Sequence, residues 1–287
     1  MADIKIIRRD DFEQVYPFLK GVDPKANIPK EAWSRLLCPN WVINEDYCGY
    51  ALIENGMVVG FLGYIFSSRK INDRIEKFCN LTTWYVNEEH RDQSMVLLYP
   101  FLELEGYTLT NFTASSRVVK ILKSLGFSTL DNRTVFLKPN LLSLFKLKSK
   151  ASLIFDGPQF ESFLSDDEKR IYHDHKPYGC FHVVIQSESG NCYMVMSRLR
   201  RGRKPFLTVR YLGNAQVFGL YGEGVVLELL LRLKAFYIRI DERLLRGVQL
   251  DLGIIQQSEV EKLYKSDTLA PGDVDYLYSE LILLGIL

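Results

Sequence analysis

The sequence lacks any long apolar run. No stretch of about 18 uncharged apolar residues, the length a membrane-spanning helix needs, occurs among its 287 residues. The first residues, MADIKIIRRDDFEQ, carry charges where a secretory signal has an apolar core. The sequence therefore predicts a cytoplasmic protein that does not associate with a membrane.

Cysteine is scarce and scattered. The five cysteines are odd in number and show no CxxC spacing. A disulfide framework needs paired cysteines, and a zinc site needs closely spaced cysteines or histidines. We therefore expect reduced thiols and no metal.

An excess of one charge is also absent, since 36 Lys and Arg balance 35 Asp and Glu to a net charge of +1. A nucleic-acid-binding surface normally carries a clear positive excess. The sequence thus predicts no nucleic-acid partner, and any ligand must be recognised by a local group of residues.

The length fits about two domains of roughly 150 residues. The first half alternates strand and helix patterns, with a hairpin at Asn55-Gly56. The pattern predicts an α/β (α+β) fold with a mixed, mainly antiparallel sheet flanked by helices, closed by a strand at residues 134–139.

The second half repeats this order of elements. A three-stranded meander over residues 180–213 is followed by a helix from Gly224. A strand at 247–254, a helix at 258–267 and a terminal strand at 274–286 complete the predicted half. The polar junction between the halves predicts domains at residues 1–145 and 150–287.

The segment WYVNEEHRDQSMVLL, read with TLTNFTASSRVVKILKSLGF, resembles the GNAT superfamily of acyl-CoA-dependent N-acyltransferases. In that family a strand leads into a loop patterned (R/Q)xxGx(G/A), whose amides at a helix start bind the coenzyme A pyrophosphate. Val86 ends the strand and Arg91 takes the first loop position. Ser94 and Val96 stand at the glycine positions.

The family pattern downstream places a tyrosine that protonates the departing thiolate. This chain has Leu122 there, although Leu125-Gly126-Phe127 is intact. Asn80 stands where some relatives carry a carboxylate base. Neither Leu122 nor Asn80 can exchange a proton, so the first domain lacks the usual acid and base.

The second domain has candidates for the loop glycines and the general-acid tyrosine that the first domain lacks. Gly222 and Gly224, with the adjoining Val225, match the spacing of the two loop glycines, and Tyr264 matches the general-acid tyrosine. The resemblance therefore assigns catalysis to the C-terminal domain. Tyr264 also suits an ordinary amphipathic helix, packed by its ring.

The resemblance implies two tandem GNAT-like domains and acyl transfer from acetyl-CoA, or another acyl-CoA, to an amine of a small molecule or peptide. An oligomer is compatible with the sequence. The alternative is a catalytically silent relative that binds a ligand or partner.

Two further motifs have competing interpretations. The cluster Arg198, Arg200, Arg201, Arg203 and Lys204 on a predicted turn is either a solvated turn or a clamp for an anion. The tripeptide at residues 173–175, HDH, reads as a solvated polar loop and not as a metal site.

Overall fold

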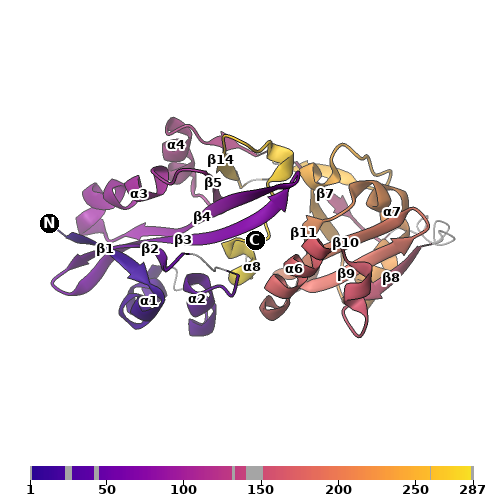
Figure 1. The fold of residues 1–287 in the computed structure, drawn as a ribbon, viewed down its shortest axis with the longest axis horizontal. Coiled ribbons are helices and arrows are strands. Elements are labelled where there is room, and N and C mark those ends of the chain that lie inside the picture. Colours follow the sequence, from indigo (N-terminus) through magenta and orange to yellow (C-terminus); the bar gives the residue numbers. More distant parts are fainter. Residues whose placement is uncertain are drawn as a thin grey trace. The chain divides into compact units, whose positions relative to one another are not determined.

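The computed structural model describes residues 2–22, 28–41, 45–130, 133–139, 151–258 and 260–285. The chain forms two compact units. Unit 1 combines Met1–Ser128 with Lys262–Leu269 and Tyr278–Leu284, and unit 2 combines Thr129–Glu261 with Ala270–Leu277 and Gly285–Leu287. Each unit is built on a mixed seven-stranded sheet flanked by helices, which confirms the predicted fold class (Figure 1).

The sheet of unit 1 is antiparallel over its first four strands and then turns parallel between β4 and β5. Asn55 and Gly56 have φ angles of 51° and 77°, as the predicted two-residue hairpin turn requires. In spatial order its strands are β1 (Asp3–Arg8), β2 (Tyr47–Glu54), β3 (Met57–Ile71), β4 (Arg74–Val86), β5 (Tyr107–Asn111), β14 (Leu263–Lys265) and β6 (Ser128–Thr129).

Helices cover both faces of this sheet. Figure 1 shows α1 (Phe12–Val22) and α2 (Lys30–Leu37) on one side and α3 (Tyr99–Leu102) and α4 (Ser116–Ser124) on the other. The short η1 (Arg9–Asp11) and η2 (Glu88–Leu97) are 3-10 turns, and α8 (Glu280–Leu283) packs against α2. Leu122 of α4 is fully buried in the core on the α3 and α4 side.

The sheet of unit 2 contains the predicted antiparallel meander, followed by a parallel pair joined through a long helix, α7 (Ala215–Arg232). Its strands in spatial order are β13 (Ile254–Gln257), β7 (Arg133–Leu137), β12 (Ile238–Asp241), β11 (Lys204–Leu212), β10 (Gly190–Arg201), β9 (Phe181–Ser187) and β8 (Ala151–Phe155). The remaining elements are η3 (Phe160–Phe163), α6 (Asp166–His175), η4 (Lys176–Tyr178), η5 (Glu242–Leu245) and η6 (Pro271–Asp273).

The two halves of the sequence exchange a strand. β7 comes from the first half but pairs with β12 and β13 in unit 2, and β14 comes from the second half but pairs with β5 in unit 1. The predicted ranges 1–145 and 150–287 contain no such exchange. Residues 140–150, where the junction was expected, lie outside the described residues.

Three predicted elements near the C-terminus are wrong. The strand expected at 247–254 is absent from residues 247–253, which form turns and irregular backbone, and β13 begins only at Ile254. Residues 258–267 were expected to form a helix but contain β14, because pairing with β5 and full burial of Leu263 outweigh a local helical pattern. The expected strand over 274–286 is wrong because Tyr276 to Ser279 lead into the helix α8.

Two predicted helices are shifted or shortened. The helix expected from Gly224 begins at Ala215, where the Asn214 side chain caps it by accepting a hydrogen bond from the Val217 amide at 3.1 Å. The helix expected over 94–106 is reduced to 3-10 turns and the four-residue α3, with Pro100 in its first turn.

The strand exchange is tested by truncating Leu263, which is fully buried in the core of unit 1. We expect Leu263→Ala to lower the free energy of unfolding by about 2–5 kcal/mol. All three tryptophans lie in unit 1, so tryptophan fluorescence during urea unfolding reports on that unit. Val260→Ala, at a position that is 44% exposed, is the control and should change little. An unchanged unfolding midpoint for Leu263→Ala would contradict the exchange.

Candidate functional site

The parallel strands β4 and β5 separate part of the way along their length. Their ladder runs from Lys77, opposite Tyr107, to Asn80, opposite Thr110, although β4 continues to Val86. Beyond Asn80 the register of β4 with β3 also shifts, and Thr83 adopts φ of +51°. A positive φ is rare for a β-branched residue, and such bulges commonly re-aim a strand next to a binding site. The edge of β4 from residue 81 to 86 is therefore not paired with β5.

A buried polar cluster lies where the strands separate. Thr110 Oγ1 donates a hydrogen bond to Asn80 Oδ1 at 3.0 Å, and Asn80 Nδ2 donates to the Glu280 carboxylate. Thr113 Oγ1 donates to Glu280 Oε1 at 2.8 Å. Asn80 and Glu280 are each 1% exposed. Because a buried carboxylate is costly without hydrogen bonds, these donors hold Glu280 in place.

Glu280 is the functional candidate that sequence reasoning missed. It occupies the first position of α8, far along the chain from Asn80, and no local pattern links the two residues. The available signal was its place as a lone acidic residue next to the apolar run LILL. Asn80 stands where some relatives carry a carboxylate base. Glu280 places a carboxylate next to this position, although it comes from a different part of the chain.

Tyr264 lies in the same row of the sheet as this cluster. It is opposite Thr110, which is in turn opposite Asn80, so the three residues cross β14, β5 and β4 in register. Residues in one such row share a sheet face, and strands about 4.8 Å apart place Tyr264 roughly 10 Å from Asn80 between Cα atoms. Tyr264 is half-buried. The structure therefore brings a phenol and a carboxylate to one face of unit 1.

The other three residues predicted in the first domain lie at the end of β4 and in the loop after it. Val86 is 6% exposed and packs in the core. Arg91 is exposed and pairs with Glu88 at 3.2 Å, and the Ser94 carbonyl accepts a hydrogen bond from Trp84 Nε1 at 3.3 Å. The loop follows the opened edge of β4, but its 3-10 turns replace the regular helix start of the predicted pattern.

Unit 2 has the same opening, and acidic side chains stand at the start of the helical segment that follows the opened strand in both units, Glu88 and Glu89 in η2 and Glu168 beside α7. β11 pairs with β12 only at Leu207 and Thr208 but continues to Leu212. A two-residue turn then enters α7, and a Cβ placed on Gly213 would lie 2.5 Å from Glu168 Oε1. The carboxylate of Glu168 therefore sits against this turn. A negative charge there disfavours binding of a pyrophosphate at the start of α7.

Gly222, Gly224 and Val225 do not lie at a helix start. All three are buried within α7, well after its first residue, Ala215. A Cβ on Gly222 would lie 2.8 Å from the Phe218 ring, so this glycine makes room for a buried aromatic side chain. The predicted glycine loop is therefore wrong. The glycines lie in unit 2 and Tyr264 lies in unit 1, so the structure does not bring them together within one unit.

No protein-family model matches the chain, and no curated protein sequence matches it. Among solved structures, it is similar to a GCN5-related N-acetyltransferase from Anabaena variabilis, with 11% identity and a TM-score of 0.58 over 92% of this chain and 72% of that one. A conserved protein of unknown function from Enterococcus faecalis V583, described as a probable N-acyltransferase, has 6% identity, the same coverage of both chains and a TM-score of 0.58. A glucosamine N-acetyltransferase region of a fungal multi-domain β-N-acetylglucosaminidase has 13% identity and a TM-score of 0.61, over 92% of this chain and 38% of that one.

The chain has the fold of the GCN5-related N-acetyltransferases. This agrees with the tandem GNAT-like arrangement that the sequence predicted, with one mixed sheet in each unit. In both GNAT-like units the parallel strand pair opens in the same way, and the two openings differ in the side chains that surround them.

Within the described residues, no group of three or more His, Cys, Asp or Glu side chains is arranged to hold a metal ion. In the same ranges, no helix is both long enough and apolar enough to cross a bilayer. The HDH tripeptide is not in a solvated loop as expected, because it ends α6 and His175 is fully buried, within hydrogen-bond distance of the Ile171 and Leu277 carbonyls.

His182 is a buried titratable group in the GNAT-like unit 2. It is 3% exposed, lies beside the Tyr172 ring, and has its Nδ1 2.7 Å from the Tyr193 hydroxyl. Burial lowers the pKa of His182 to about 4. The side chain is therefore neutral in the folded protein at neutral pH.

Gly222→Val distinguishes a packing glycine from a coenzyme-binding glycine. The new side chain meets the buried Phe218 ring, so we expect a loss of about 1–3 kcal/mol in the free energy of unfolding, with acyl-CoA affinity of the folded protein unchanged. Gly21→Val in α1, where nothing lies within 4 Å, is the matched control and should be nearly neutral. Loss of acyl-CoA binding by Gly222→Val at an unchanged melting temperature would restore the glycine-loop interpretation.

His182 predicts a pH dependence of stability. The unfolded chain takes up a proton near pH 6.5, whereas folded His182 does so only near pH 4. Unfolding is therefore favoured increasingly as the pH falls from 6.5 to 4, by up to about 3 kcal/mol. Urea unfolding of His182→Gln should show a flatter dependence over this range. His173→Gln, at an exposed histidine, should keep the wild-type slope. Equal slopes in His182→Gln and wild type would contradict the assignment.

Proposed function

We propose that the protein is an acyl-CoA-dependent N-acyltransferase whose active site lies in unit 1. The observation that carries this proposal is the opening between β4 and β5, with Glu280 and Tyr264 on the same face of the sheet. The fold supports acyl-CoA as the co-substrate. The sequence alone favoured the C-terminal domain, but Gly222 and Gly224 are buried within α7, and Tyr264 belongs to unit 1.

The opened edge of β4 suits the extended arm of a coenzyme A thioester. The arm carries amide groups, and an exposed strand edge binds extended amides by main-chain hydrogen bonds, as in strand addition. A backbone amide on residues 81–86 would polarise the thioester carbonyl. Arg91 is the cation on the following loop that would face the coenzyme phosphates.

In the proposed reaction, Glu280 accepts the proton of the attacking amine, which forms a bond to the acyl carbon as the carbon–sulfur bond breaks. Tyr264 donates its phenolic proton to the departing thiolate. Asn80 acts as a positioning residue, since its amide links Glu280 to Thr110 on the sheet. Proximity of the two substrates supplies the remainder of the rate enhancement.

The proposed class of acceptor is inferred from the reaction, which needs an attacking amine, and not from the shape of a pocket. A neutral amine of a small molecule or peptide is the proposed acceptor. A cytoplasmic location and the lack of a nucleic-acid partner stay predictions from the sequence, and oligomerisation is untested.

A silent binding protein is the second candidate function. It is favoured by the loop after β4, where α3 has four residues and Pro100 stands in its first turn. Leu122, at the family's tyrosine position, is fully buried in the core. These features weaken the coenzyme site without removing the opening of the strands.

Calorimetric titration with acetyl-CoA tests whether the protein has a coenzyme site at all. Micromolar affinity supports the coenzyme site that the acyltransferase requires, and absence of binding at millimolar acetyl-CoA would overturn that site and favour the silent protein. A panel of amine acceptors, followed by release of free thiol, then tests turnover. Binding of acetyl-CoA without turnover of any acceptor would favour the silent binding protein.

Tyr264→Phe tests the proposed acid. Removing the hydroxyl while keeping the ring should lower kcat by about 10²- to 10⁴-fold with acetyl-CoA affinity unchanged. Tyr50→Phe, at a half-buried tyrosine of β2 in the same unit, is the matched control and should keep full turnover. Equal turnover in the two variants would rule out Tyr264 as the proton donor.

Glu280→Gln tests the proposed base with little change in shape. We expect kcat to fall by at least about 10²-fold and the rise of rate with pH to disappear, because an amide accepts no proton. The melting temperature must be measured in parallel, since Glu280 is buried. A variant that loses stability but keeps the wild-type pH profile would assign Glu280 a structural role.

A further inference from the structure

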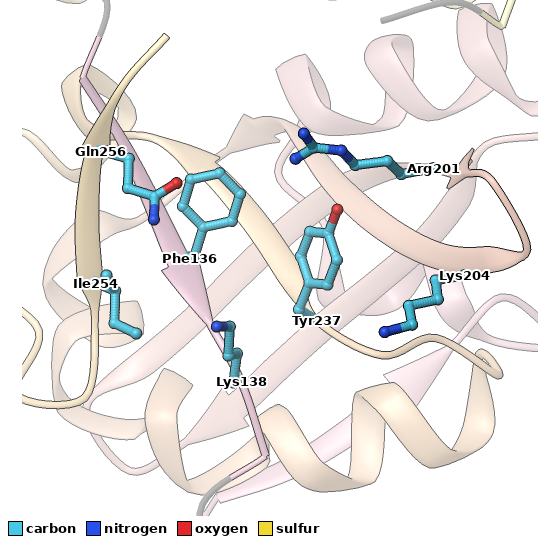
Figure 2. A pocket seen from close by; sticks show the side chains of 7 residues that line it. All are labelled: Phe136, Lys138, Arg201, Lys204, Tyr237, Ile254 and Gln256. Carbon is cyan, nitrogen blue, oxygen red and sulfur yellow. The ribbon is translucent and has the colours of Figure 1, made fainter.

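A cavity of about 240 Å³ lies on one face of the sheet of unit 2 (Figure 2). Val135 and Leu137 of β7 and Ile238 of β12 face the core beneath α7, so their neighbours in sequence face the opposite side of the sheet. The cavity is lined by Phe136, Lys138, Arg201, Lys204, Tyr237, Ile254 and Gln256.

Aromatic rings form the floor of this cavity. Tyr237 stacks on Phe206 with ring centroids 4.9 Å apart and planes 7° apart. Phe136 lies beside it at 5.8 Å. Phe136 and Tyr237 are only half-buried. Their stacking fixes the Tyr237 ring, and a planar ligand could extend the stack at low entropic cost.

Three cations surround the floor. Arg201 and Lys204 are directly opposite each other across the hairpin between β10 and β11, whose turn contains Gly202 at φ of +61°. Like charges in directly opposite positions repel. Figure 2 shows the Arg201 guanidinium above the hydroxyl end of Tyr237, Lys204 to the right of that ring, and Lys138 to its left near the end of β7.

These charges are not neutralised by the protein. None of the seven lining residues is acidic, and within the described ranges none of the three cations forms an ion pair with a carboxylate. Bringing an anion between them would relieve the repulsion and add charge-assisted hydrogen bonds. Two members of the basic cluster on the turn, Arg201 and Lys204, thus line a cavity that contains no acidic side chain.

The cavity is separate from the strand opening of unit 2. That opening begins beyond Thr208, towards the end of β11, whereas the cavity borders Lys204 at the start of β11. The helix start of α7, at Ala215, follows the far end of the same strand. An anion in this cavity would therefore not occupy the position that a GNAT-type cofactor takes.

We propose that this cavity binds a small aromatic anion of the nucleoside monophosphate class. Its base stacks on Tyr237 and Phe136, and its phosphate lies between Arg201, Lys204 and Lys138. The volume of about 240 Å³ lies just below the roughly 300–1,000 Å³ of ordinary ligand pockets, so the cavity suits a ligand no larger than a ring with one phosphate. Gln256 offers amide groups for the edge of the base.

The test is calorimetric titration of the full chain with AMP, adenosine and ribose 5-phosphate. We expect AMP to bind at least tenfold more tightly than either partial ligand, because the cavity engages both the ring and the phosphate. Equal binding of ribose 5-phosphate, or absence of AMP binding at millimolar concentration, would overturn the proposal.

Variants locate the site. The double substitution Arg201→Gln and Lys204→Gln, at exposed positions, should weaken AMP binding at least tenfold. Arg203→Gln removes a charge from the same turn but does not line the cavity, so it should bind AMP like wild type. AMP binding that survives the double substitution and is displaced by coenzyme A would place AMP at the acyl-CoA site and contradict the proposal. If acetyl-CoA does not bind, the AMP titration still tests this proposal, because the cavity is separate from the proposed acyl-CoA site.

Discussion

The pairing of β14 with β5 is the constraint on which the architecture of unit 1 depends. Without β14, β5 would expose a row of unsatisfied backbone groups, and exposed edges of this kind promote aggregation. The strand carries Leu263 into the core and Tyr264 onto the opposite face. The segment that follows it then delivers Glu280 to Asn80. A stabilising contact between distant parts of the chain therefore also assembles the proposed chemistry.

The sequence predicted the parts of the fold that local patterns determine. The Asn55-Gly56 turn, the meander of unit 2 and the helix α4 follow from turn residues and apolar periodicity, and all three are present. The exchange of β7 and β14 could not be predicted in this way, because pairing between segments so far apart leaves no local pattern. The residues around Tyr264 suit a helix when taken alone, and β5 imposes the strand.

The sequence predicted less of the candidate site than of the fold. Arg91 and Ser94 follow the opened strand as the resemblance implied, whereas Gly222 and Gly224 matched a motif by spacing and serve packing. Glycines occur both at helix starts and at close contacts, so their spacing alone does not distinguish the two roles. The charge of Glu168, which lies against Gly213, does not separate the two units, because η2 after the opened strand of unit 1 begins with Glu88 and Glu89.

The most direct test of where the acyl-CoA binds is hydrogen–deuterium exchange with and without a non-transferable thioether analogue of acetyl-CoA. Our account predicts slower exchange in residues 81–98, which form the opened edge of β4 and the loop after it, because ligand amides would pair with that edge. Residues 209–216 at the corresponding position in unit 2 should exchange at an unchanged rate. Protection confined to residues 209–216 would contradict the assignment of the active site to unit 1.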